Sequence, residues 1–127
     1  MNRYIIVTHG SLGGELISTA AAIVGEYDNI EALTLDIGES FESFYGKVTD
    51  CVNRVMSEYG KENLLFFVDI NGGTPFNVIS LLLHDKGAYV ITGVNLTMIL
   101  EALESDEPIN ELAHELVEIG KEAISLL

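Results

Sequence analysis

Four short apolar runs alternate with longer stretches whose apolar residues recur every three or four positions, and this alternation restricts the possible folds most. The runs cover residues 3–7, 30–35, 63–68 and 89–92. Three of them are almost continuously apolar, which is typical of strands covered on both faces. Strands that alternate with helices form a parallel sheet with right-handed crossovers. The sequence therefore predicts an α/β fold.

Helical spacing of apolar residues marks five stretches between and after these strands. The first ends near Gly25, and the others cover residues 41–60, 76–86, 96–104 and 109–127. We expect a three-layer sandwich of flavodoxin-like topology, with a mainly parallel sheet of strand order 2-1-3-4. Because the chain contains no linker or low-complexity segment, residues 1–127 are expected to form a single domain.

The helices expected at 76–86 and 96–104 carry more apolar residues than one buried stripe needs. Both helices can lie between layers of the same chain. Alternatively, part of their surface forms a homodimer interface, since monomers seldom expose large apolar patches. The sequence leaves both interpretations open.

The charge of the chain excludes several classes of partner. Twenty acidic residues against six basic ones give a net charge of −14, which repels nucleic acid and anionic lipid. The single cysteine, Cys51, forms no internal disulfide and no cysteine zinc cluster, and it suits a reducing compartment. No apolar run is long enough for a signal peptide or a membrane span. We therefore expect a cytoplasmic protein with no direct membrane insertion.

A histidine and an aspartate follow two strands that the expected order makes neighbours. Ligands of parallel α/β sheets bind at the carboxyl ends of the strands, where the strand order reverses. His9 follows the first strand and Asp69 the third. A carboxylate that accepts a hydrogen bond from one imidazole nitrogen fixes the tautomer and leaves the other nitrogen free to attack. His9 and Asp69 are thus the candidate catalytic residues, although a histidine that only fills the rim is the alternative.

The segment after the third strand has the features of an anion site. Thr74 suits the N-cap of a helix and Pro75 its first turn. Gly72 and Gly73 let the backbone approach a ligand closely. Free N–H groups at a helix start bind anions, and the Thr74 hydroxyl adds a donor. We expect Gly72, Gly73 and Thr74, together with Gly10 after the first strand, to hold a phosphoryl group.

Other candidate groups are weaker. His84 is interpreted as structural, His114 as a solvated residue on the polar face of the last helix, and Asp36 as a turn residue before Gly38. A metal site made by His9, Asp36 and Asp69 has little support, so no metal or cofactor is expected. The chain lacks a phosphate-binding P-loop and a G-x-S-x-G elbow. It also lacks the acidic pair with which a receiver domain holds magnesium.

Three blocks together resemble a known family. Thr-His-Gly at 8–10, D-x-x-G-G-T-P-F-N at 69–77 and Gly-Val-Asn at 93–95 are similar to the IIA component of the mannose/fructose/sorbose family of the sugar phosphotransferase system (PTS). The resemblance runs over essentially the whole chain. It implies a cytoplasmic phosphotransferase component in which Nε2 of His9 accepts a phosphoryl group from the histidine-containing phosphocarrier protein HPr. Asp69 would orient the imidazole and Thr74 would lie beside the phosphoryl group.

The resemblance also implies partners. His9 would pass its phosphoryl group to a IIB component for sugar uptake, and the chain would form a homodimer. Some relatives continue into a IIB domain, so here IIB is expected as a separate protein. Two alternatives stay open: a regulatory phosphoacceptor module of the dihydroxyacetone kinase or transcription activator type, and a flavodoxin-like protein that binds flavin or nucleotide.

Overall fold

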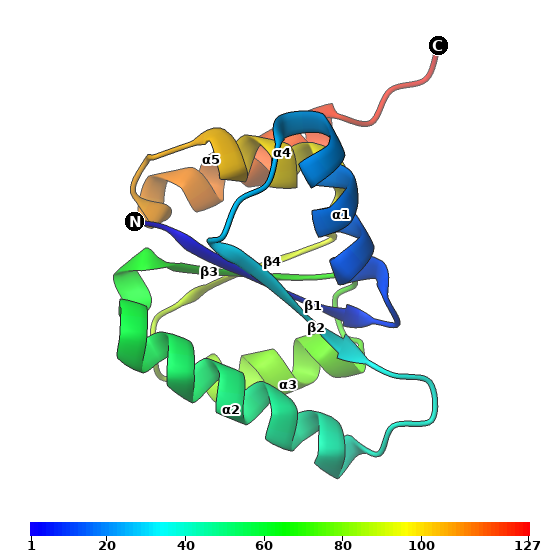
Figure 1. The fold of residues 1–127 in the computed structure, drawn as a ribbon, viewed down its shortest axis with the longest axis vertical. Helices are drawn as coiled ribbons and strands as arrows, with labels where there is room; N and C mark the ends of the chain where they lie inside the picture. Colours follow the sequence, from blue (N-terminus) through cyan, green and yellow to red (C-terminus); the bar gives the residue numbers. More distant parts are fainter.

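The predicted strands form one parallel sheet in the computed structural model, which describes residues 1–127 (Figure 1). The strands are β1 (Arg3–His9), β2 (Ile30–Leu35), β3 (Leu64–Val68) and β4 (Tyr89–Thr92). Their order is β2-β1-β3-β4, and all three pairings are parallel. Both the fold class and the strand order predicted from the sequence are therefore confirmed.

Helices cover both faces of the sheet, which gives the predicted three layers (Figure 1). The helices are α1 (Leu12–Val24), α2 (Phe41–Tyr59), α3 (Thr74–Leu83), α4 (Leu96–Glu104) and α5 (Ile109–Glu122), with a short 3₁₀ turn η1 (Lys61–Asn63) before β3. Helices α1, α4 and α5 lie on one face, and α2 and α3 on the other. No helix is both long and apolar enough to cross a membrane.

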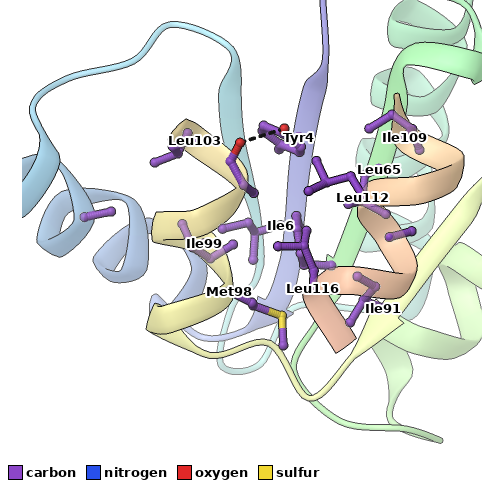
Figure 2. Close-up of a cluster of buried hydrophobic side chains, with 14 residues drawn as sticks. Tyr4, Ile6, Leu65, Ile91, Met98, Ile99, Leu103, Ile109, Leu112 and Leu116 are labelled. Atoms are coloured by element: carbon purple, nitrogen blue, oxygen red, sulfur yellow. Dashed lines mark hydrogen bonds between the residues drawn. The ribbon is translucent and has the colours of Figure 1, made fainter. Parts of the chain in front are cut away.

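Alternate residues of each strand supply the two cores. In β1, Tyr4 and Ile6 face α4 and α5 (Figure 2), whereas Ile5 and Val7 face α2 and α3; all four are fully buried. The hydroxyl of Tyr4 donates to the backbone oxygen of Ala102 at 2.8 Å, so its polar atom is paired. Burial of each such side chain stabilises the fold by about 1.5–3 kcal/mol. Burial on both faces explains the continuous apolar runs.

The apolar residues of α3 and α4 lie mostly inside the chain. Val78, Ile79 and Leu83 of α3 are buried against the sheet and α2, while Leu81 is 63% exposed. The apolar residues of α4 all belong to or pack against the core on the α1, α4 and α5 side. Packing within one chain therefore accounts for most of these residues, and the homodimer stays a prediction.

Several predicted boundaries are wrong by a few residues. Strand β1 continues two residues further than predicted, to His9, and helix α3 begins two residues earlier, at Thr74. Helix α3 ends at Leu83, because the chain turns there and Gly87 takes a φ of +71°. Strand β3 begins one residue late, since Asn63 belongs to η1. The last helix was predicted to reach residue 127 but ends at Glu122. Beyond that point the apolar side chains have no core to cover them; Ile124 is 80% exposed, and the tail projects from the body (Figure 1).

Candidate functional site

The carboxyl ends of the two central strands bring His9 and Asp69 into contact. Val7 of β1 pairs with Val68 of β3, so the strands end side by side. His9 is the last residue of β1 and Asp69 directly follows β3. Nδ1 of His9 lies 2.7 Å from Oδ2 of Asp69, and the backbone N–H of His9 donates to the same oxygen at 2.9 Å. The sheet register therefore joins the two residues that the sequence analysis paired.

The Asp69 carboxylate is held by three donors. Besides the two groups of His9, the backbone N–H of Ile70 donates to Oδ1 at 3.0 Å. Partial burial by itself raises the pKa of Asp69, but the hydrogen bonds from His9 and Ile70 outweigh it, and the pKa lies below its usual value. The carboxylate is thus ionised at neutral pH and acts only as an acceptor.

This carboxylate determines the tautomer of the imidazole. Because ionised Asp69 can only accept, Nδ1 of His9 carries the hydrogen and Nε2 keeps a free lone pair. The His9 side chain is 46% exposed, whereas that of Asp69 is 10% exposed. The carboxylate that orients the ring is therefore largely buried, whereas the ring itself can be reached from solvent. This is the arrangement of a nucleophile or general base.

Gly73 lies against Cε1 of the imidazole, the carbon between the two ring nitrogens. A Cβ at this position would stand 2.8 Å from Cε1 of His9 and 3.2 Å from Cγ1 of Ile70. The φ of Gly73 is −78°, which any residue adopts, so space and not backbone conformation requires glycine here. Gly72 differs: its φ is +84° and a Cβ would meet nothing within 4 Å. Gly73 is therefore required for the space beside the imidazole, and Gly72 for a backbone conformation that other residues rarely adopt.

Helix α3 begins beside His9, but its cap differs from the prediction. Gly73 takes the N-cap position and Thr74 is the first helical residue, with no side-chain cap. The first main-chain bond of the helix runs from the N–H of Asn77 to the oxygen of Gly73 at 2.9 Å. The N–H groups of Thr74 and Phe76 therefore precede the helical bonds, and Pro75 has none. Since Thr74 does not cap the helix, its hydroxyl is available to a ligand.

Thr8 belongs to the Thr-His-Gly block, but the sequence analysis gave it no role of its own. Its side chain is fully buried, and Oγ1 accepts a hydrogen bond from the N–H of Gly13 at 3.0 Å. The bond ties the start of α1 to the end of β1 and so supports the turn after His9. A polar residue at the end of an apolar strand was the available signal.

Gly10 contributes through its conformation. Its φ is +55°, which lets the chain turn sharply after β1. Its N–H donates to the oxygen of Leu35 at 2.9 Å, so that donor is already used within the protein. A role of Gly10 beside the phosphoryl group therefore stays a prediction, and it does not rest on this N–H. The remaining donors belong to the 72–76 segment.

The other candidates lie apart from this site. The carboxylate of Asp36 lies 3.6 Å from Nζ of Lys47. The backbone oxygen of Asp36 accepts a hydrogen bond from the N–H of Glu39, in the expected turn. His84 is the C-cap of α3, and His114 stacks edge-on with Tyr89. No three His, Cys, Asp or Glu side chains lie close enough together to hold a metal ion.

Large apolar side chains are exposed on the same edge of the sheet as His9. We call these four residues the apolar rim: Leu12, Ile37, Phe41 and Ile70, which are 45%, 101%, 56% and 57% exposed. They follow the carboxyl ends of β1, β2 and β3, at the right in Figure 1. Exposed apolar groups that gather on one face mark an interaction surface.

Comparison with known proteins finds relatives that all belong to the same transport system. The sequence profile of a family described as "PTS system fructose IIA component" (EIIA-man) matches residues 3–119. The chain is 35% identical over 127 residues to the mannose-specific EIIAB component of Escherichia coli K12, covering 97% of this chain and 38% of that relative. It is 32% identical over 108 residues to the fructose-specific EIIA component of Bacillus subtilis, covering 84% and 72%. This chain thus spans well under half of the first relative.

Solved structures share the fold. The EIIA component of Streptococcus agalactiae superposes with a TM-score of 0.84 at 29% identity, over 99% of this chain and 97% of that one. A mannose/sorbose-specific IIA subunit from Enterococcus faecalis gives a TM-score of 0.86 at 26% identity, over 99% and 94%. These similarities cover the sheet, all five helices and the His9 edge.

Proposed function

Because this chain belongs to the EIIA-man family of IIA components of the sugar phosphotransferase system, we propose that it is a cytoplasmic phosphocarrier in sugar uptake and that Nε2 of His9 carries the phosphoryl group. The observation that carries the proposal is the contact of 2.7 Å between Nδ1 of His9 and Oδ2 of Asp69. It leaves one ring nitrogen with a free lone pair, on a side chain that is 46% exposed. A carrier needs such a nitrogen to take up and release the same group.

In the first transfer, HPr presents its own phosphohistidine. The lone pair on Nε2 of His9 attacks phosphorus, a new N–P bond forms, and the N–P bond to HPr breaks, with its electron pair returning to the HPr imidazole. The His9 ring gains positive charge as the bond forms. The ionised Asp69 carboxylate stabilises this charge through Nδ1–H and keeps the ring in position. Onward transfer to a IIB component repeats these steps in reverse.

The start of α3 supplies donors for the phosphoryl oxygens. The N–H groups of Thr74 and Phe76 precede the helical bonds, and the helix dipole favours an anion there. Gly73 and the Thr74 hydroxyl add two more donors, and Gly72 provides the turn that leads to them. Phosphoryl transfer needs mainly positioning and charge stabilisation. This edge thus supports the reaction without a metal ligand set.

The apolar rim suits two protein partners that bind in turn. HPr and IIB must both reach the same nitrogen of His9, so they use one face and exclude each other. Around the rim the carboxylates of Asp36, Glu39 and Glu42 outnumber the single base Lys47, which already pairs with Asp36 and Glu39. A partner with an apolar centre and basic surroundings complements this face.

We also propose that the chain forms homodimers. Ile124, Leu126 and Leu127 are 80–114% exposed beyond α5, and monomers seldom leave such a cluster in water. Sedimentation equilibrium at micromolar concentration tests this. A single species with the mass of one chain would exclude the homodimer.

Reconstituted phosphorylation tests the carrier function. The chain is incubated with phosphoenolpyruvate, enzyme I and HPr, and the intact mass is measured before and after mild acid. We expect one acid-labile phosphoryl group, which His9→Ala abolishes and the matched changes His84→Ala and His114→Ala leave in place. Undiminished labelling of His9→Ala would end the proposal. Labelling of His9 without transfer to any IIB component would instead indicate a regulatory phosphoacceptor.

A further inference from the structure

The two segments that form the His9 site contain no lysine or arginine. Residues 8–14 and 69–77 hold none, and Lys47 at the rim already donates to the backbone oxygen of Thr34 at 2.6 Å and to Glu39 at 3.1 Å. Backbone N–H groups at the start of α3 therefore have to balance most of the charge of a phosphoryl group. Such donors are most effective when their direction is fixed before the anion arrives.

The cap of α3 leaves these N–H groups free. Ser40 caps α2 and Asn95 caps α4 by accepting, at 3.1 Å, the N–H of the residue three positions later. Helix α3 instead has Gly73 at the N-cap, with no side chain that could take the N–H of Phe76. A capping oxygen would compete with a bound anion for this donor. The start of α3 must therefore be held in another way.

Asn77 holds this start from inside the helix. Its backbone N–H donates to the oxygen of Gly73 at 2.9 Å, and its Nδ2 donates to the oxygen of Gly72 at 3.4 Å. The residue is exposed, and asparagine is a poorer helix former than alanine. Neither burial nor helix propensity thus explains an asparagine here, whereas the hydrogen bond to Gly72 does.

The two hydrogen bonds fix the direction of two donors. Every peptide bond of the chain is trans, so each C=O and the N–H that follows it point in opposite directions. Because the oxygens of Gly72 and Gly73 turn toward Asn77, the two N–H groups that follow them point away from it. These N–H groups belong to Gly73 and Thr74, and neither donates to another backbone group. Gly73 lies against the His9 ring, so the donors are beside the imidazole.

We propose that Asn77 is a positioning residue for phosphoryl transfer. Its side-chain amide holds the oxygen of Gly72 and thereby directs the N–H of Gly73 to the phosphoryl group on His9. This inference rests on the proposed function, because Asn77 acts only through the Gly72–Gly73 peptide and carries out no reaction of its own. It gives a role to the last residue of the 69–77 block.

Two variants that remove the donor test this role in single-turnover phosphorylation by phospho-HPr. The maximal rate should fall about tenfold in Asn77→Ala, and further in Asn77→Asp, whose carboxylate repels the Gly72 oxygen and the phosphoryl group. The phospho-HPr concentration that gives half the maximal rate should change less than about twofold, since the apolar rim is intact. Thermal stability should not fall, because alanine favours the helix and an aspartate in its first turn favours the dipole.

The matched control is Asn53→Ala. Asn53 is exposed on α2, and its side chain makes no hydrogen bond, so this variant should transfer at the unaltered rate.

Titration with inorganic phosphate gives a second measurement that involves no transfer. The amide resonances of Gly73, Thr74 and Phe76 are followed by NMR in the unphosphorylated chain, with sodium chloride of equal ionic strength as the blank. We expect saturable shifts in the unaltered chain and in Asn53→Ala. In Asn77→Ala, about tenfold more phosphate should be needed for the same shifts.

Several results would overturn the role of Asn77. Unchanged transfer and phosphate binding in Asn77→Ala would show that the hydrogen bond to Gly72 is unimportant. A higher half-saturating phospho-HPr concentration at an unchanged maximal rate would show direct contact with the partner. A slower rate accompanied by lower thermal stability would show a structural role, and no phosphate shift in the unaltered chain would exclude these donors. Failure of phospho-HPr to label the unaltered chain would refute the proposed function alone, because the phosphate titration is independent of transfer.

Discussion

Oδ2 of Asp69 accepts two hydrogen bonds from His9, one from the backbone N–H at 2.9 Å and one from Nδ1 at 2.7 Å. The first bond ties the end of β1 to the residue after β3, and the second orients the ring. A single carboxylate oxygen therefore links the architecture of the sheet to the chemistry of the imidazole. Changes at Asp69 should affect reactivity much more than folding.

Asp69→Asn should reduce the rate of phosphoryl transfer about 100-fold or more. The amide lacks the negative charge that stabilises the positive ring, and its NH₂ group only donates, so it cannot replace the oxygen that accepts from the N–H of Ile70. One lost acceptor costs about 1–2 kcal/mol, so the variant should stay folded. Single-turnover phosphorylation by phospho-HPr and thermal unfolding measure the two effects. Asp50→Asn, an exposed and unpaired change in the middle of α2, is the control and should transfer normally.

The lowered pKa of Asp69 makes its contribution to stability depend on pH. The folded chain holds this proton less tightly than the unfolded chain, so the contribution is complete above about pH 5 and is lost as the pH falls through the folded pKa. Urea unfolding of the unaltered chain and Asp69→Asn measures it. The difference in unfolding free energy between them should be constant near neutrality and shrink in acid. A pH-independent difference would contradict the assignment.

Gly73→Ala should impair phosphorylation with little effect on stability. Its Cβ would lie 2.8 Å from Cε1 of His9, so the ring must move away from Asp69. The φ of −78° accepts alanine without strain. Gly25→Ala is the matched control with the opposite expectation: its φ of +90° costs about 1 kcal/mol, but it follows α1 outside the site and a Cβ there meets no atom within 4 Å. Equal transfer rates in both variants would show that the contact with Cε1 is unimportant.

The residues that sequence analysis paired correctly are those whose placement follows from sheet register. Continuous apolar runs identified β1 and β3 as buried strands; His9 is the last residue of β1, and Asp69 directly follows β3. Once two parallel strands are neighbours, the residues after them share an edge. This argument needs only the backbone.

Features that depend on side-chain packing were missed. A glycine in a turn looks the same whether it supplies a positive φ, as Gly72 does, or space for a ring, as Gly73 does. The buried hydroxyl of Thr8 has meaning only once Gly13 lies beside it. The last helix ends where the core no longer covers it. The helical spacing of apolar residues continues through Ile124 and so does not reveal this end. Such relationships depend on contacts between elements that are distant in the sequence.

Polar substitution in the apolar rim should weaken docking without changing chemistry. Ile37→Ser/Phe41→Ser should raise the KM for phospho-HPr about tenfold and leave kcat within about twofold, because His9, Asp69 and Gly73 are untouched. Steady-state phosphorylation measures both constants. Ile23→Ser on α1, at a similarly exposed position of 58%, is the control. A fall in kcat with an unchanged KM would show that the rim acts on the catalytic residues instead.

Glu31 should be important for stability and should protect the only thiol. Its carboxylate binds Arg3 and Arg54, and these bonds outweigh burial and lower the pKa of Glu31. Burial, together with the Glu31 carboxylate, raises the pKa of Cys51 to about 12. The native thiol should therefore react with a disulfide reagent only when the structure opens.

Glu31→Gln leaves two guanidinium groups without their carboxylate and should lower the unfolding free energy by about 1–3 kcal/mol. Labelling of Cys51 at mildly alkaline pH should then accelerate by about 10–100-fold, since each 1.4 kcal/mol changes the open population about tenfold. Urea denaturation and thiol labelling together measure this. Asp50→Asn, an exposed change on the same helix, should alter neither. Faster labelling without loss of stability would mean that the carboxylate acts on the thiol directly.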